Sequence, residues 1–362
     1  AGSRVWLYDT SSHAAEQART ALDHQWQSLV AKGRLAPDAA QAYLARVSVA
    51  QDLQAFAPCT LVVEAAIERL DIKQHVFADL ERIVSAETVL ATNTSSLPIT
   101  AIAARLKRPQ RFAGYHFFNP APLMKVVEVV RGLATEDSVC QSLADYARQM
   151  GHTPVQAQDT PGFIVNHAGR GYGTEALRIV SEDVADFQTI DLILREQAGF
   201  KLGPFELMDL TGLDVSHPVM ESIYRQYYDE PRFKPSVITA QRLSAGLLGR
   251  KSGAGFYAYD NGQARLAPEP AVPEVATLPP VWVSPRAARR PELLQLLKNL
   301  GATLETGAHA SAHALILVAP LGFDVTTLAA VDRLDATRTL GIDMLVSDEV
   351  TRRRVLATNP AT

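Results

Sequence analysis

The feature that most constrains the fold is an alternation, over the first 157 residues, of short apolar runs with stretches of helical periodicity. Runs that are rich in β-branched residues and bounded by polar turns are typical of strands. Because these runs are apolar almost throughout, both faces of their sheet must be covered, as in a parallel sheet flanked by helices. The sequence therefore predicts an α/β fold with a Rossmann-like, doubly wound parallel sheet over residues 1–158. The predicted strands are residues 4–9, 61–65, 88–93, 112–118, 126–130 and 153–157.

The strand–helix rhythm stops at residue 159. Thr160 can cap a helix that has Pro161 in its first position, and helical periodicity then runs from residue 163 to residue 180. Helical patterns continue to about residue 248, where a glycine-rich segment closes the region. We therefore expect an all-α domain over residues 159–260, with a dimer interface on its apolar helix faces.

A third part follows a stretch of linker composition at residues 261–280. Beyond it, residues 281–283 and 314–319 have strand character, and residues 291–300 have helical periodicity. We interpret residues 281–362 as a small, partial α/β domain. The linker is defined by Pro268, Pro270, Pro273, Pro279 and Pro280.

Charge and cysteine content exclude several classes of protein. Lys and Arg number 35 against 39 Asp and Glu, so the net charge of −4 supplies no basic field for nucleic acid or an anionic membrane surface. No apolar run has the ~18 residues that a membrane-spanning helix needs. Two cysteines, Cys59 and Cys140, argue against a disulfide framework and fit a cytoplasmic protein. We expect no bound metal, because the histidines show no metal-ligand spacing.

Asp9 ends the first predicted strand and precedes a helix. In a dinucleotide-binding fold, a carboxylate in this place accepts hydrogen bonds from the adenosine ribose and repels the extra phosphate of NADP. The same residue could equally be a plain helix cap. The glycine-rich phosphate loop that would confirm the role of Asp9 at the ribose is absent, because the chain begins only a few residues before this strand. We therefore expect that the sequence is cut at its N-terminus.

His116 and Glu128 each lie inside an apolar strand. A lone histidine in such a place is more often a satisfied core residue, but a buried acid is costly unless it is paired. If the two side chains face each other across adjacent strands, both are satisfied, and the carboxylate stabilises the imidazolium form of a general base. Hydroxyl groups at residues 92–96 follow another strand, at the sheet edge where ligands bind. Asn166 lies one turn into the predicted helix and completes the candidate site.

These motifs resemble those of the 3-hydroxyacyl-CoA dehydrogenase family, in order and in spacing, over roughly residues 4–260. The third part resembles the middle of longer bacterial members, in which a second helical domain follows, so the chain looks shortened at both ends. The segments that carry the resemblance are NTSS at 93–96, RFAGYHFFNP at 111–120, VVEVV at 126–130, DTPGFIVN at 159–166, GPFELMD at 203–209 and GRKSGAGFY at 249–257.

The resemblance implies a role for each matching residue. His116 would be the general base and Glu128 its orienting partner, while Ser95 and Asn166 would hydrogen-bond the reacting oxygen and the thioester region. Ser95 could instead cap the following helix, and Glu68 and Lys73 could be ordinary surface charges. The residues placed at the cofactor are Asp9, Glu68, Lys73, Ser95, Asn119 and Lys251. Those placed at the substrate are Ser95, Asn166 and Lys32.

The implied activity is NAD-dependent oxidation of an L-3-hydroxyacyl-CoA to the 3-oxoacyl-CoA by a homodimer. The longer bacterial architecture favours short or dicarboxylic substrates such as 3-hydroxybutyryl-CoA or 3-hydroxyadipyl-CoA, in β-oxidation or in the degradation of aromatic compounds such as phenylacetate. Two alternatives stay open: a dehydrogenase of free hydroxy acids on the same scaffold, and a catalytically silent binding module.

Overall fold

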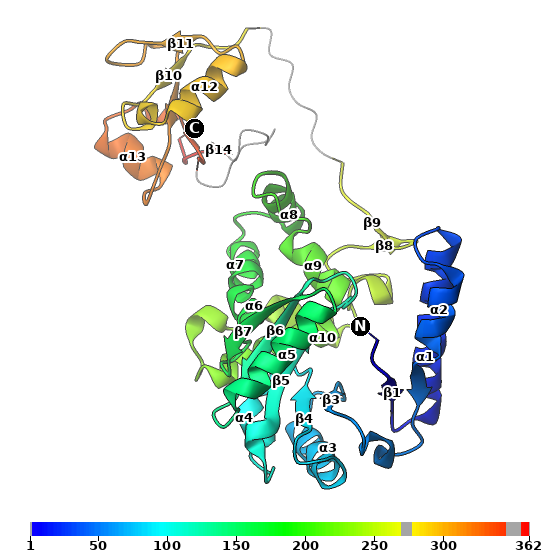
Figure 1. Cartoon of the computed structure of the whole chain (residues 1–362). Helices are drawn as coiled ribbons and strands as arrows, with labels where there is room; N and C mark the ends of the chain where they lie inside the picture. The colour runs from blue at the N-terminus through cyan, green and yellow to red at the C-terminus, as the bar shows by residue number, and fades with distance from the viewer. Residues whose placement is uncertain (1, 269–276, 345–355, 362) are drawn as a thin grey trace. The chain divides into compact units, whose positions relative to one another are not determined.

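The computed structural model describes residues 2–268, 277–344 and 356–361. The chain forms two compact units, which are drawn together in Figure 1. The first comprises Ala1–Arg170 and Val219–Lys234, and the second comprises Gly171–Pro218 and Pro235–Thr362. Among the described residues, no helix is both long enough and apolar enough to cross a membrane.

Some of the predictions fall outside these residues. Pro270 and Pro273 of the predicted linker lie in the undescribed stretch 269–276, and residues 345–355 of the predicted third part are likewise not described. The domain limits at residues 158 and 260 stay predictions.

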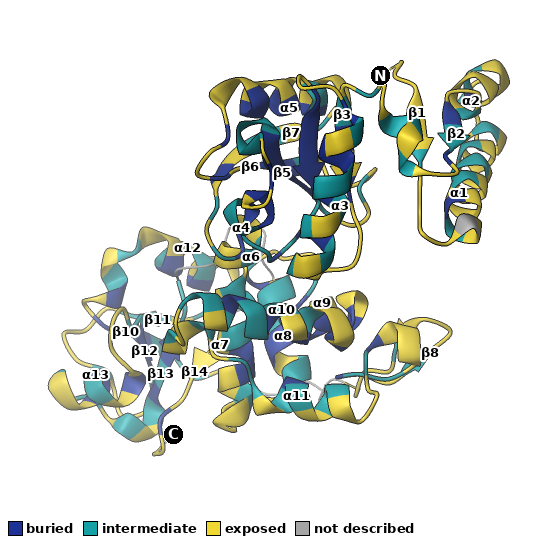
Figure 2. Ribbon diagram, turned by 90° about the horizontal axis from the view of Figure 1, so that it is seen from below, coloured by how far each residue is buried: buried dark blue, intermediate teal, exposed yellow. Residues whose placement is uncertain are grey.

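A five-stranded sheet forms the centre of the first unit, in the order β3-β4-β5-β6-β7. β3, β4 and β5 are parallel, β6 is antiparallel to β5, and β7 is parallel to β6. Figure 2 shows the middle of this sheet in dark blue, as expected for strands that are covered on both faces. The strands are β3 (Leu61–Glu64), β4 (Val89–Thr92), β5 (Phe112–Phe117), β6 (Val126–Arg131) and β7 (Thr153–Gln158).

Helices cover the two faces of this sheet. Phe77, Ile99 and Ile102 of the first face belong to one apolar cluster with strand residues, and Val139 and Leu143 of the second face belong to another. Successive strand residues point to opposite faces, so this division fixes which strand side chains share a face. The first face carries α3 (Leu70–Ile83) and α4 (Ile99–Ala103), and the second carries α5 (Asp137–Gln149).

The predicted single sheet is in two pieces. β1 (Val5–Leu7) pairs in parallel with β2 (Val47–Val49), a strand that the sequence analysis did not predict. Neither strand pairs with β3 in the described part of the chain, because β1 bonds only to β2 and β3 only to β4. α1 (Ser12–Ala31) and α2 (Pro37–Leu44) connect β1 to β2. The Rossmann-like strand–helix alternation is otherwise as predicted.

The entry into the helical region differs from the prediction. Thr160 does not cap a helix that starts at Pro161. Instead, its backbone carbonyl oxygen accepts the N–H of Phe163 in a turn. Gly162 and Phe163 both have positive φ, of 78° and 51°, so the chain is not helical there. The helices begin after this turn, with α6 (Val165–Ala168) and α7 (Arg170–Ser181). The turn leaves the N–H groups at the start of α6 free for a side chain of the sheet.

Two buried carboxylates organise the second unit. Asp191 accepts the N–H groups of Phe205 and Glu206 at 2.9 and 3.0 Å, which caps α9, and a Cβ at Gly203 would collide with it. Asp209 accepts the N–H groups of Phe256 and Tyr257 in the same way. Gly203 and Gly255 are therefore required for packing, because a Cβ at either position would collide with one of these two carboxylates. The helices of this unit are α8 (Phe187–Glu196), α9 (Pro204–Thr211) and α11 (Val237–Ser244), and β8 (Tyr259–Asp260) pairs with β9 (Gln263–Ala264). Helix α10 (Leu213–Gln226) is divided between the units, because its residues from Val219 onward belong to the first.

The pH dependence of stability should reflect Asp191. Burial raises the pKa of its carboxyl from 3.8 to about 6. The folded state therefore keeps a proton that the unfolded state has lost, so stability falls as the pH rises through this window. A difference of roughly 2 between the two pKa values corresponds to about 3 kcal/mol. Urea unfolding at about pH 4 and about pH 7 should show a smaller pH effect in Asp191→Asn, and equal effects would contradict this account.

The C-terminal part of the second unit contains its own sheet, in the order β11-β10-β12-β13-β14. The first four strands are parallel, and β14 is antiparallel to β13. This confirms the predicted return to an α/β pattern. The elements are β10 (Val281–Val283), α12 (Pro291–Asn299), β11 (Leu304–Glu305), β12 (Leu315–Val318), α13 (Val325–Val331), β13 (Thr339–Ile342) and β14 (Leu356–Ala357).

Candidate active site

His116 on β5 and Glu128 on β6 are direct partners across the antiparallel strand pair. Nδ1 of the imidazole lies 2.7 Å from Oε2 of the carboxylate, and the two residues are 3% and 0% exposed. An ionised carboxylate can only accept a hydrogen bond, so Nδ1 carries the hydrogen and Nε2 of the neutral ring is an acceptor. The pairing that the sequence suggested is present, and it prepares Nε2 to take a proton.

The second oxygen of Glu128 holds the start of α6. Oε1 accepts the N–H groups of Ile164 and Val165, each at 2.9 Å. Burial alone would raise the pKa of this carboxyl, but the bonds from His116 and from these two N–H groups outweigh burial and hold the pKa below its usual value. Glu128 therefore stays ionised and joins the sheet to the helix that carries Asn166.

Ser95 completes the contact with the imidazole. Its Oγ lies 3.2 Å from Nε2 of His116, in the loop between β4 and α4. Asn166 donates from Nδ2 to the carbonyl oxygen of Ser95 at 3.3 Å, so the predicted residues Ser95, His116, Glu128 and Asn166 form one cluster. Gln226, which sequence reasoning missed, donates to the next carbonyl, that of Ser96, at 2.7 Å. No local pattern marks Gln226, because it lies 130 residues from its partner.

Glu68 anchors the loop that carries Ser95. Its Oε1 accepts the hydroxyl of Thr94 at 2.5 Å and the N–H groups of Ser95 and Ser96 at 2.9 and 3.1 Å. Burial opposes ionisation, yet these bonds and the charge of Lys73 hold the pKa of Glu68 below its usual value. Glu68 is therefore not an ordinary surface charge, since it orients Ser95 toward the imidazole.

Lys73 is buried, at 1% exposure, and is also not a surface charge. Its Nζ donates to Glu64 at 2.7 Å and to the carbonyl oxygen of Ala66 at 3.1 Å, and it lies 3.4 Å from Glu68. Glu64 in turn accepts the hydroxyl of Thr92 at 2.7 Å. Sequence reasoning did not assign Glu64, although an acid at the end of an apolar strand was a usable signal. This network fixes the ends of β3 and β4 beneath the Ser95 loop.

The remaining predicted residues are not part of this cluster. Asp9 is exposed, and its Oδ1 accepts the N–H of Ser11 at 2.8 Å, so it does cap a turn. Lys32 is exposed at the end of α1, and Asn119 is exposed beyond β5. Lys251 belongs to the second unit, where its Nζ pairs with Asp214 at 2.6 Å.

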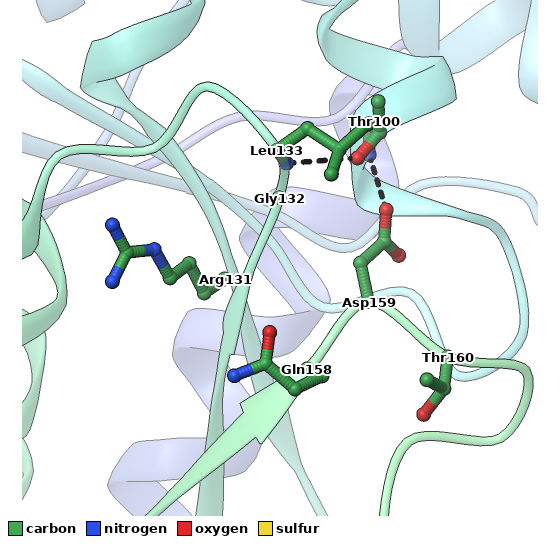
Figure 3. Close-up of a pocket in the computed structure, with 7 residues that line it drawn as sticks. All are labelled: Thr100, Arg131, Gly132, Leu133, Gln158, Asp159 and Thr160. Carbon is green, nitrogen blue, oxygen red and sulfur yellow. Dashed lines mark hydrogen bonds between the residues drawn. The ribbon is translucent and has the colours of Figure 1, made fainter.

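A cavity lies elsewhere in the first unit. It has a volume of about 490 Å³ and is lined at the carboxyl ends of β6 and β7, as Figure 3 shows. Asp159 already accepts the N–H groups of Ile99 and Thr100, each at 2.7 Å, and Arg131 pairs with Asp137. Because β6 and β7 run against β5, this cavity faces away from the carboxyl end of β5. It is not the candidate active site.

The residues beyond the strand ends fit a nicotinamide dinucleotide. The loops that follow β3, β4 and β5 leave the same edge of a parallel sheet, which is where dinucleotides bind. Glu68 and Ser95 lie in these loops. Asp9 follows β1, and its second oxygen, which has no hydrogen-bond partner among residues 2–268, can accept from a ribose hydroxyl.

Comparison with known families decides the assignment. A family model described as "3-hydroxyacyl-CoA dehydrogenase, NAD binding domain" matches residues 1–160, and one described as "3-hydroxyacyl-CoA dehydrogenase, C-terminal domain" matches residues 162–259. The chain belongs to the 3-hydroxyacyl-CoA dehydrogenase family. This confirms the resemblance drawn from the motifs, the Rossmann-like fold and NAD as the cofactor. The protein is an NAD-dependent dehydrogenase that acts on 3-hydroxyacyl-CoA.

Individual relatives agree with the family. The chain is 39% identical over 331 residues to 3-hydroxyadipyl-CoA dehydrogenase of Escherichia coli, covering 91% of this chain and 69% of that protein. It is 40% identical over 258 residues to a probable 3-hydroxybutyryl-CoA dehydrogenase of Deinococcus radiodurans, covering 71% and 92%. The crystal structure of 3-hydroxybutyryl-CoA dehydrogenase from E. coli K12 matches with a TM-score of 0.80 at 35% identity, covering 95% of this chain and 68% of that one.

Proposed function

We propose that His116, Glu128, Ser95 and Asn166 carry out the reaction. The observation that supports this is the position of His116 Nε2, an acceptor 3.2 Å from Ser95 Oγ while Nδ1 is held by Glu128. Nε2 takes the proton of the C3 hydroxyl, and the charge of Glu128 stabilises the imidazolium that results. Bound NAD would supply the acceptor for the hydride that C3 loses. Ser95 and Asn166 hydrogen-bond the reacting oxygen and the thioester region of the substrate. The proposed cofactor contacts are Asp9, Glu68, Lys73, Ser95, Asn119 and Lys251.

We propose a short or dicarboxylic acyl chain for the substrate. The support is the names of the relatives, which act on 3-hydroxyadipyl-CoA and 3-hydroxybutyryl-CoA. Such substrates belong to β-oxidation or to the degradation of aromatic compounds. We further propose that Lys32 contacts the CoA moiety, that residues 159–260 form the dimer interface, and that the protein works in the cytoplasm, which its two free cysteines favour.

Absorbance at the NADH band tests the function. We expect the full chain to oxidise NADH with acetoacetyl-CoA and with 3-oxoadipyl-CoA, and to leave free acetoacetate unchanged. Turnover of the free keto acid alone would favour the hydroxy-acid alternative. An intact, folded chain that neither turns over nor binds NADH in calorimetry would be the silent binding module.

Glu68→Ala should lower kcat by roughly 10- to 100-fold, because the Ser95 loop loses a charged acceptor of several hydrogen bonds. Glu68→Gln is the matched variant, since its amide oxygen can still accept from the Thr94 hydroxyl and the Ser95 N–H. Steady-state kinetics should show that glutamine restores most of the activity that alanine loses. Equal activity of the alanine variant and the wild type would contradict the positioning role.

A further inference from the structure

A second cavity lies in the C-terminal sheet, far along the chain from the residues assigned to the dehydrogenase reaction. It has a volume of about 190 Å³ and is lined by Ser284, Arg286, Arg290, Ala319, Leu321, Phe323, Leu328 and Asp332. Sites for drug-sized ligands usually have roughly 300–1,000 Å³, so this cavity suits a smaller molecule than a dinucleotide or an acyl-CoA.

The topology of the sheet gives this cavity a specific place. From β10 the chain passes to β11 on one side and then to β12 on the other, so the connections diverge between β10 and β12. In open parallel sheets, ligands bind outside the carboxyl ends of the strands at such a switch point. Ser284 directly follows β10, Ala319 directly follows β12, and both line the cavity.

The polar groups of the cavity favour an anion. Arg286 pairs with Asp332 at 3.4 Å, whereas Arg290 has no ion-pair partner in the described part of the chain. The cavity lining contains two guanidinium groups and one carboxylate, so its net charge is +1. Ser284 is buried, at 2% exposure, and its Oγ accepts the N–H of Ala287 at 3.3 Å. Its hydroxyl hydrogen has no acceptor among the described residues and is available to a ligand.

The other wall of the cavity is apolar. Leu328 is buried, while Leu321 and Phe323 are 57% and 56% exposed at the rim. Apolar side chains beside two arginines suit a molecule with one charged end and a short hydrocarbon body. We propose that this cavity binds a small organic anion, through a carboxylate or phosphate group held by Arg290, Arg286 and Ser284.

Calorimetric titration of the full chain at constant ionic strength tests this site. The probes are butyrate and inorganic phosphate, and we expect at least one to bind saturably with a Kd of about 1 mM or tighter. Binding of butyrate alone would identify a carboxylate ligand, and binding of phosphate a phosphate ligand. Arg290→Gln should weaken binding by about tenfold or more, because a charged hydrogen-bond donor is lost.

Arg289→Gln is the matched control, because Arg289 is exposed, adjacent in sequence and not among the lining residues. Its affinity should stay within about twofold of the wild type. Arg286→Gln is a second test if Arg290→Gln does not fold. Failure of both probes to bind, or equal weakening by the Arg289 and Arg290 variants, would overturn the proposal. Neither result bears on the dehydrogenase reaction, which is measured separately.

Discussion

Replacing His116 with alanine is expected to lower kcat for an L-3-hydroxyacyl-CoA by roughly 10²- to 10⁴-fold. The variant loses the imidazole, whose Nδ1 is held by Glu128 and whose Nε2 contacts Ser95. No other imidazole in the described part of the chain has both contacts. NADH affinity should change much less, because the proposed cofactor contacts lie on other side chains. Steady-state kinetics measure the first quantity, and fluorescence titration with NADH measures the second.

His152→Ala provides a control for this experiment. His152 packs edge-on against Phe117 of the same strand as His116, with ring centroids 5.5 Å apart, but its Nε2 contacts a backbone carbonyl outside the site. Its removal should leave kcat near the wild-type value. Wild-type turnover by His116→Ala would remove the general base from the mechanism.

Glu128→Gln should be nearly as damaging, with kcat lowered by roughly 10²- to 10⁴-fold. The amide oxygen can still accept the N–H groups of Ile164 and Val165, so the amide nitrogen then faces Nδ1 of His116. Because two donors cannot bond, the imidazole hydrogen moves to Nε2, which is thereby lost as a base. Steady-state kinetics together with nitrogen chemical shifts of the imidazole would detect both the loss of rate and the change of tautomer.

Glu81→Gln separates this effect from a loss of stability. Glu81 is also a buried carboxylate of the first unit, and it accepts the N–H groups of Lys107 and Arg108 at 2.9 and 2.7 Å. Its substitution should lower the melting temperature without lowering kcat. If Glu128→Gln behaved in the same way, with kcat intact and His116 unchanged in tautomer, Glu128 would be only a structural residue.

Ionisation of Glu128 also contributes to stability. Because its folded pKa lies below the usual carboxyl value, the contribution is present above that usual value and is lost as the pH falls through the folded pKa. This sign is opposite to that of Asp191, whose raised pKa makes the fold less stable as the pH rises. Together, these two groups should make the fold most stable in mildly acidic solution, where Glu128 is ionised and Asp191 is still protonated.

Local sequence was sufficient for the five strands of the central sheet and for the pairing of His116 with Glu128, although it did not reveal β2. Alternation along a strand has a period of two, so apolar neighbours on both sides of His116 and Glu128 already indicate that each side chain is buried in a sheet. Motif order then supplied the family, because the same residue types recur at the same spacing. These patterns are local, so they can be recognised in the sequence without knowledge of the tertiary structure.

Only the tertiary structure decided how the site is supported. Glu68 bonds a backbone N–H 27 residues away, and Glu128 bonds one 36 residues away, so no local pattern distinguishes either residue from a surface acid or a core acid. The start of α6 is likewise set by the carboxylate that its N–H groups reach, rather than by Thr160 and Pro161. Sequence determines which side chains must be buried or exposed. Which buried polar groups bond to one another depends on long-range contacts. A buried polar group is destabilising without a hydrogen-bond partner, and that partner can come from any segment that the fold brings close.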